Sequence, residues 1–445
     1  MSKTNHDKPT NKHQVRAVPA SRTGRFLRMA KMAGGITGGM LAEGTRQLAA
    51  GKRPKVKDML LTPGNAKRVA DQLSAMRGAA MKVGQILSME SDQFLPKELA
   101  DILGQLRANA HSMPAKQLEQ AMVQAYGEDW RYEFYHFDPT PIAAASIGQV
   151  HRVTTSDNRQ LALKIQFPGI GKSIDSDVDN IATLLSATGL LPESIDIKPL
   201  LKDAKQQLHE EANYYHEAKY LQRFYEVLAT DNRFTVPALH RDLSSQHILA
   251  MDFVEGEDIE ILSTLPQQER NRVMANLLEL ALRELFELRL IQSDPNFANY
   301  RYNPDDKKIV LLDFGACRKL KVRFVKSYAQ LANATINGND TQLIEAAQKL
   351  GYQLDNASAE YQSLILKLFY LALEPLREDN EYDFANSQLP ERLAEFSVDI
   401  NNFKEFWHAP PTDVLYLHRK IGGMFLLASR LQAKVNVHEL IKPWL

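Results

Sequence analysis

The 445-residue chain has a single cysteine, Cys317, which excludes a disulfide framework and a cysteine-based zinc site. No stretch reaches the roughly 18 uninterrupted apolar residues that a membrane-spanning helix needs. Lysine plus arginine equals aspartate plus glutamate, at 54 each, so no net charge draws the chain to nucleic acid, and no nucleic-acid partner is expected. No repeat of roughly 20–50 residues is apparent. These absences favour an ordinary globular protein of one large or two to three ordinary domains.

Charge is unevenly distributed, because basic residues dominate the start of the chain. The first 57 residues contain only two acids, Asp7 and Glu43. Residues 1–25 predict a disordered basic tail, which fits either a mitochondrial transit peptide or a solvated bacterial tail. Residues 26–50 carry a Gly-x-x-x-Gly spacing. This segment fits a soluble helix packed closely on a neighbour, or a peripheral contact with an anionic membrane surface.

The strongest chemical pattern lies between residues 291 and 317. Asp294 is followed by Asn299, and an apolar run then leads to Asp313-Phe-Gly. Phosphoryl-transfer enzymes of the protein-kinase type use this arrangement. One carboxylate orients the attacking hydroxyl, and an amide oxygen and a second carboxylate hold Mg²⁺, which prefers oxygen ligands. The pattern predicts Asp294 as the catalytic aspartate and Asn299 and Asp313 as metal ligands.

Lys164 lies in an alternating strand pattern of the kind that carries the phosphate-binding lysine in kinases. An isolated strand lysine is more often an edge charge, so this assignment needs a glutamate partner on the next helix. The helical pattern over residues 203–229 offers several acids. Helical rotation separates Glu211 from Glu217, so both could serve one site only if this helix is bent or interrupted.

The usual glycine-rich phosphate loop is missing, and an alanine-rich stretch stands in its place. The residues concerned are Ala143, Ala144, Ala145 and Ser146. Because alanine has a Cβ, its backbone approaches phosphate less closely than that of glycine. A conventional nucleotide-covering loop is therefore doubtful, although these residues stay candidates for nucleotide binding.

The string His240-Arg-Asp-Leu imitates a kinase catalytic loop letter for letter. No asparagine lies five residues beyond Asp242, where the chain has His247, and no Asp-Phe-Gly follows at the required distance. We interpret it as a turn between two strands. The segment after it would join two lobes, with Met251 and Val254 contacting the adenine.

Residues 65–110 are strongly helical in pattern, with Lys82 and Gln85 one turn apart on one face. By composition alone, such a pair is a solvated surface pair. The chain has no Ala-Pro-Glu motif and no obvious long segment for docking a peptide substrate.

Together these residues resemble the UbiB/AarF family of atypical kinases, the aarF-domain kinases that support coenzyme Q biosynthesis. The resemblance rests on four features: the Lys-x-Gly-Gln string at Lys82, the alanine-rich loop, Lys164, and the set Asp294, Asn299 and Asp313. It runs from about residue 26 to the C-terminus and includes Leu417-His-Arg-Lys-Ile-Gly-Gly.

The resemblance implies further roles. Lys82 and Gln85 would cover the active site as a regulatory lid. Glu217 would pair with Lys164, and Glu211 would join the metal ligands. The family's Glu-x-Asp motif here ends in Asn213, which should weaken any metal or lysine contact made there.

The predicted fold is α+β, a two-lobed protein-kinase-like fold with an N-terminal helical extension. The expected divisions are a basic tail (1–25), the helical extension (26–130), an N-lobe (131–256) and a helical C-lobe (257–445). The expected ligands are ATP and Mg²⁺. The expected function is atypical kinase or ATPase chemistry that supports ubiquinone biosynthesis.

Partners and place in the cell follow from the resemblance. A lipid or quinone-precursor substrate is expected, in a homodimer or a quinone-biosynthesis complex. The protein would be cytoplasmic and peripheral at the inner membrane, or mitochondrial. Two alternatives stay open: a nucleotide-switched scaffold that binds a lipid or an enzyme, and a small-molecule kinase.

Overall fold

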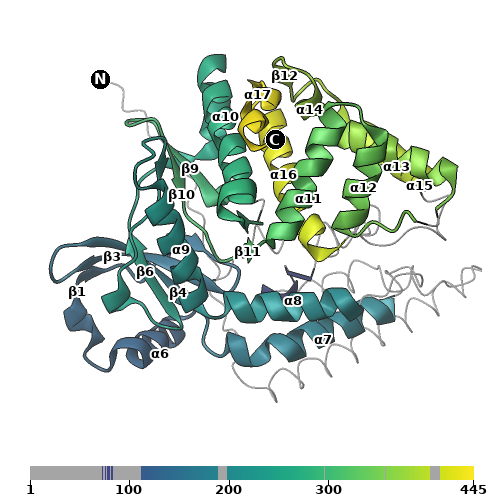
Figure 1. Cartoon of the computed structure of the whole chain (residues 1–445). Coiled ribbons are helices and arrows are strands. Elements are labelled where there is room, and N and C mark those ends of the chain that lie inside the picture. The colour runs from purple at the N-terminus through teal and green to yellow at the C-terminus, as the bar shows by residue number, and fades with distance from the viewer. Residues whose placement is uncertain are drawn as a thin grey trace, which may run out of the picture. The chain divides into compact units, whose positions relative to one another are not determined.

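The computed structural model describes residues 73, 76, 78–80, 82–83, 112–188, 198–294, 296–355, 357–400 and 411–445. The predicted basic tail, the glycine-rich segment and Gln85 lie outside the described residues. The chain forms two compact units (Figure 1). The first is Met1–Ala218 with Ala238–Phe253, and the second is Lys219–Pro237 with Val254–Leu445.

An antiparallel sheet organises the first unit. Its strands follow the order β1-β3-β4-β6, and β2 pairs with β3. Their bounds are β1 Phe134–Phe137, β2 Ala143–Ala144, β3 Gly148–Thr155, β4 Gln160–Gln166 and β6 Ile248–Asp252. β4 is nearly all buried because it has a partner strand on each side, which explains its continuous apolar character.

Helices precede, separate and follow the strands of this sheet along the chain. α6 (Ala115–Tyr126) ends at Gly127, whose φ of 88° favours glycine, and a 3₁₀ turn (Trp130–Glu133) leads into β1. α7 (Ile170–Thr188) and α8 (Lys198–Glu211) lie side by side (Figure 1). α9 (Tyr214–Leu228) crosses the division between the units. The helix predicted over residues 203–229 is therefore interrupted.

Small sheets and a set of helices build the described part of the second unit. Two of these sheets have the orders β5-β10-β9-β7 and β11-β8. Their strands are β5 Phe234–Thr235, β7 Glu257–Asp258, β8 Leu290–Gln292, β9 Tyr300–Asn303, β10 Lys308–Leu311 and β11 Cys317–Lys319. α10 (Gln267–Arg283) continues into a π-helical turn (Glu284–Leu288).

The remainder of the second unit is mostly helical, as the sequence predicts. The helices are α11 Val322–Ile336, α12 Asp340–Leu350, α13 Ala359–Ala372, α14 Glu374–Arg377, α15 Leu389–Ile400, α16 Thr412–Arg430 and α17 Val437–Ile441. The short strands β12 (Tyr382–Asp383) and β13 (Lys434–Val435) pair with each other. Among the helices described, none is both long and apolar enough to cross a bilayer.

Candidate functional site

Lys164 and Glu217 form a buried ion pair in the first unit. Lys164 Nζ donates to both carboxylate oxygens, at 2.6 Å and 2.8 Å. Lys164 lies on the central strand β4, so it is not an edge charge. Glu217 lies in the first turn of α9, where the helix dipole favours a carboxylate. The pairing that the family resemblance implies is present.

The alanine-rich stretch forms a tight hairpin rather than an open loop. Ala143 pairs with Val150 across β2 and β3, and Ala145 N–H donates to the Gly148 carbonyl at 2.9 Å. A Cβ at Gly148 would lie 2.4 Å from the Ile165 carbonyl oxygen. Close backbone packing therefore requires glycine at this position.

A helical segment around residue 80 packs directly on this hairpin. A Cβ at Gly78 would lie 2.8 Å from Ile147 Cγ2 and 3.2 Å from the Ser146 carbonyl oxygen. A larger residue at this position would push the segment away. The approach of this segment to the alanine-rich hairpin thus depends on Gly78.

The same segment brings Lys82 to Glu211. Lys82 Nζ forms an ion pair with Glu211 Oε1, and Ser146 Oγ donates to Glu211 Oε2 at 3.3 Å. Lys82 is 5% exposed, so the solvated position expected from composition alone is wrong for this lysine. Its burial follows from packing that composition does not report. Glu211 holds a lysine and a hydroxyl in this structure.

Asn213 occupies the break between α8 and α9. Its side-chain oxygen accepts a hydrogen bond from Tyr215 N–H at 3.2 Å, the geometry of a helix N-cap. Gln166 Nε2 donates to the Ala212 carbonyl at 2.9 Å and holds the break from β4. Aspartate and asparagine cap helices about equally well, so this contact accounts for either residue without a metal.

In the second unit, Asp294 and Asn299 contact each other. Asn299 Nδ2 donates to Asp294 Oδ2 at 3.3 Å. Between them, Asn296 caps a short 3₁₀ turn (η5, Phe297–Asn299) by accepting from Ala298 N–H at 3.2 Å. Local turn chemistry therefore places the two side chains five residues apart on one side of the loop.

Asp313 is held beside this loop through the backbone. Leu312 N–H donates to the Asn299 carbonyl at 3.1 Å, and Ser293 N–H donates to the Ala316 carbonyl at 3.0 Å. Asp313 Oδ1 accepts from Gly315 N–H at 2.8 Å. These bonds join the segment that carries Asp294 and Asn299 to the segment that carries Asp313.

The phenylalanine of Asp313-Phe-Gly is buried within the same unit. Its ring centroid lies 4.8 Å from that of Phe224 on α9. Phe314 is therefore a packing residue that fixes the turn after Asp313.

The oxygen donors in the second unit suit magnesium. Within the described residues, no group of three or more His, Cys, Asp or Glu side chains could hold a metal ion. In nucleotide sites Mg²⁺ needs only one or two protein ligands, because water and phosphate oxygens complete its octahedron. Asp313 and Asn299, on two segments joined by hydrogen bonds, match this modest requirement.

Sequence reasoning missed one contact of Asp294. Arg419 NH2, on α16, lies 3.2 Å from Asp294 Oδ1, and the two residues are 125 positions apart. Its one signal in the sequence is weak, a His-Arg-Lys string in a mostly apolar helical stretch. Asp294 thus accepts hydrogen bonds on both carboxylate oxygens.

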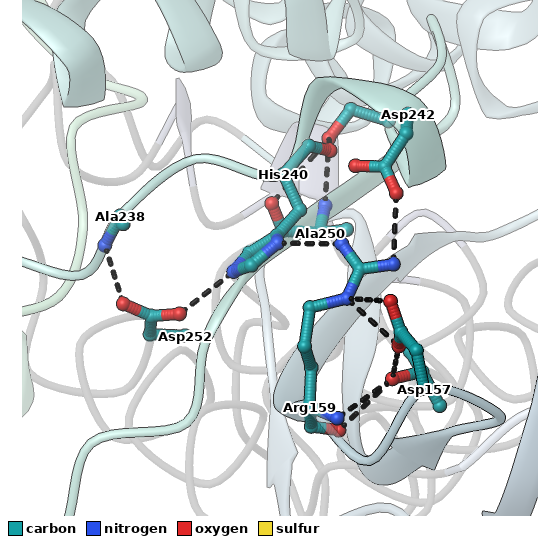
Figure 2. A network of polar contacts seen from close by, with 9 residues as sticks. Asp157, Arg159, Ala238, His240, Asp242, Ala250 and Asp252 are labelled. Atoms are coloured by element: carbon teal, nitrogen blue, oxygen red, sulfur yellow. Dashed lines mark hydrogen bonds and ion pairs between the residues drawn. The ribbon is translucent and has the colours of Figure 1, made fainter.

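The imitation loop at His240 is a turn between strands, as predicted. A 3₁₀ turn (Arg241–Leu243) separates β5 from β6. Figure 2 shows Arg159 at the centre of its polar network. Arg159 pairs with Asp242 at 2.9 Å and contacts His240 Nδ1 at 3.0 Å, and His240 Nε2 lies 2.7 Å from Asp252. Because a guanidinium only donates, Nδ1 accepts and Nε2 donates to Asp252.

This network holds the start of the predicted connection between lobes. Met251 is buried on β6 opposite Ala162, and Asp252 follows it. The division between the two units falls between Phe253 and Val254. The adenine contacts predicted for Met251 and Val254 remain predictions.

Comparisons with known proteins agree on the class. The sequence model of the ABC1 atypical kinase-like domain matches residues 105–347. The complex structure of Rv3197 and erythromycin from Mycobacterium tuberculosis superimposes with a TM-score of 0.60 at 22% identity. The match covers 85% of this chain and 96% of that one. This likeness confirms the predicted α+β kinase-like fold.

Two curated relatives cover nearly the whole chain. "Atypical kinase COQ8, mitochondrial" of Saccharomyces cerevisiae is 34% identical over 429 residues, which are 96% of this chain and 85% of that protein. "Atypical kinase coq-8, mitochondrial" of Caenorhabditis elegans is also 34% identical, but the chain spans only 57% of its length. The chain belongs to the ABC1 atypical kinase-like family, which confirms the resemblance found from its motifs.

Proposed function

We propose that this protein is an atypical kinase or ATPase that binds ATP and Mg²⁺ and supports ubiquinone biosynthesis at a membrane face. Family membership supports the kinase class. The observation that carries the proposal is the hydrogen-bonded arrangement of Asp294, Asn299 and Asp313. Three oxygen-bearing side chains on two joined segments suit metal-assisted phosphoryl transfer.

The residues divide the work as follows. Lys164, held by Glu217, contacts the nucleotide phosphates. Asp294 orients the attacking hydroxyl or water, and Arg419 donates a charge-assisted hydrogen bond to its carboxylate. The alanine-rich hairpin with Ser146, together with Met251 and Val254, shapes the nucleotide pocket.

Asp313 and Asn299 hold the metal in this proposal. Magnesium supplies charge neutralisation on the phosphates when it is bound. Glu211 would be a third ligand. Because Glu211 now forms an ion pair with Lys82, it can bind the metal only after this ion pair breaks. That exchange of Lys82 for the metal would couple metal binding to movement of the Lys82 segment.

Lys82 and Gln85 act as a lid in this proposal, which favours a small or lipid-derived substrate, or water, over a protein. The names of the relatives place those proteins in mitochondria. We extend this to a peripheral site on the mitochondrial or bacterial inner membrane. A homodimer or a quinone-biosynthesis complex is part of the same proposal.

The test is Asp313→Asn, which removes a metal-binding charge and keeps the side-chain shape. Mg²⁺-dependent ATP hydrolysis should fall by roughly 10²–10³-fold, because phosphoryl transfer depends mainly on electrostatic stabilisation. The matched control is Asp306→Asn, an exposed acid of the same unit, which should keep full turnover. Cells that carry only Asp313→Asn should also lose ubiquinone.

Two results would refute parts of this proposal. Unchanged hydrolysis in Asp313→Asn would remove the mechanism. Unchanged quinone pools, with hydrolysis lost, would remove the pathway and leave the chemistry.

A nucleotide-switched scaffold with little turnover is the second candidate. The Lys82–Glu211 ion pair favours it, because this pair occupies an acid that metal chemistry would use. Tight Mg²⁺-nucleotide binding without turnover, in the presence of membranes, would support this scaffold over the enzyme.

A further inference from the structure

Three polar side chains meet inside the second unit. Lys420 Nζ, on α16, lies 3.1 Å from Glu284 Oε1 and 3.0 Å from the Tyr300 hydroxyl. Glu284 and Lys420 are each 2% exposed and Tyr300 is 4% exposed. The ion pair joins residues 136 positions apart, so only the tertiary fold brings them together.

Glu284 and Tyr300 each hold one end of the loop that carries Asp294. Glu284 Oε2 accepts from Gln292 N–H at 2.9 Å, two residues before Asp294. Tyr300 directly follows Asn299 at the other end. Lys420 bridges the two, so the cluster spans residues 292–300 from end to end.

The backbone around Glu284 is unusual. α10 widens into a π-helical turn at Glu284, and the turn ends at Arg289 with a left-handed φ of 51°. π-helical turns are rare and occur frequently at functional sites. Here the turn begins at the residue whose carboxylate reaches Gln292 N–H.

Stability does not explain this cluster. Removing two charges from water costs several kcal/mol per ion, and hydrophobic replacements of buried ion pairs are often neutral or stabilising. Burial lowers the pKa of Lys420, but the charge of Glu284 and the contacts with Glu284 and Tyr300 together outweigh burial and raise this pKa above its ordinary value, so the lysine stays charged. Burial raises the pKa of Glu284 above its ordinary value. A polar pair kept at this depth against the cost of burial calls for another reason, which its contacts with the loop supply.

We propose that Glu284, Lys420 and Tyr300 form a positioning triad that sets the geometry of loop 292–300 for phosphoryl transfer. This inference rests on the proposed function, because it assigns to the triad the placement of Asp294 and Asn299. Phosphoryl transfer is sensitive to placement, and a misplacement of about 1 Å can cost roughly 10²-fold in rate.

The test uses a neutral double variant, Glu284→Gln with Lys420→Met. A single change would leave one buried charge unpaired and threaten folding, whereas the double change removes both charges and keeps the volume. The double variant should melt near the wild type, bind nucleotide with unchanged Kd, and turn over at least about 10-fold more slowly. Tyr300→Phe should give a smaller loss of the same kind, since it removes one hydrogen bond.

The matched control is a second ion pair of the same unit. Arg233 NH1 lies 2.5 Å from Glu279 Oε2, away from loop 292–300 in the sequence. The double variant Arg233→Met with Glu279→Gln should keep wild-type turnover. Hydrogen exchange of the peptide that covers residues 292–300 should quicken in the triad variants and stay unchanged in this control.

The exchange measurement separates the two proposals. If the wild type shows no Mg²⁺-dependent turnover, the proposed enzyme fails, but faster exchange in the triad variants still supports the triad. If the folded double variant and Tyr300→Phe keep both wild-type exchange and wild-type turnover, the triad proposal is wrong.

Discussion

Two loops of this molecule present an aspartate in a kinase-like context, one in each unit. The first unit has His240-Arg-Asp-Leu, and the second has Gln292-Ser-Asp with Asn299. Asp242 is 56% exposed and pairs with Arg159, which directly precedes β4. Asp294 is 23% exposed and accepts from Asn299 and from Arg419.

The difference shows that matching letters are weaker evidence than matching partners. The first loop has the letters, but its aspartate makes an exposed ion pair with Arg159, shown in Figure 2. The second loop lacks the histidine and arginine. It has the asparagine, the joined Asp313 segment and buried supports instead. An aspartate needs such neighbours before it can take part in chemistry.

The largest expected effect on turnover comes from replacing Asp294 with asparagine, and the same replacement at Asp242 is its control. Asp294→Asn should lower turnover by roughly 10²–10⁴-fold, because the variant can no longer accept the proton of the attacking group. Asp242→Asn makes the same chemical change in the other loop and should leave turnover unchanged. Steady-state ATP hydrolysis measures both. Equal losses in the two variants would erase the distinction between the loops.

The sequence predicts most of the second loop, because its information is local. The spacing of Asp294, Asn299 and Asp313 is fixed by a short turn and one hairpin, so sequence separation reports spatial separation. The break before Glu217 could be anticipated as well. A continuous helix would turn Glu211 and Glu217 to different faces.

The remaining contacts could not be predicted, because they join distant segments. Lys82 and Glu211 are 129 positions apart, and Lys420 and Glu284 are 136 apart. Nothing in a single sequence fixes which helix faces meet at such separations. Asn213 shows a second limit, because its N-cap contact was not predicted from the sequence, while the weakened metal or lysine contact expected there stays a prediction.

An intermediate effect is expected at Arg419, which is less exposed than Arg159, the arginine that pairs with Asp242 in the imitation loop. Arg419→Met removes the guanidinium from Asp294 Oδ1 and keeps the apolar stem. Turnover should fall about 10-fold, as is reasonable for one charge-assisted hydrogen bond worth about 1.5 kcal/mol. The Kd of this variant for Mg²⁺-nucleotide should equal that of the wild type. Arg419→Lys should recover part of the loss, and full activity in Arg419→Met would make this arginine a bystander.

The smallest expected effect is the change in the free energy of unfolding when the ion pair of the imitation loop is removed. Hydrogen bonding from Arg159 lowers the pKa of Asp242 below its ordinary value. A lowered folded-state pKa means that the pair stabilises the fold above the unfolded pKa of about 4 and that this contribution is lost as pH falls further. Because the pair is exposed, Asp242→Asn should cost only about 0.2–1 kcal/mol at pH 7, and less at high salt. Urea unfolding at pH 7 and pH 3 checks this. A cost that persists at pH 3 would mean that Asp242 acts through packing rather than charge.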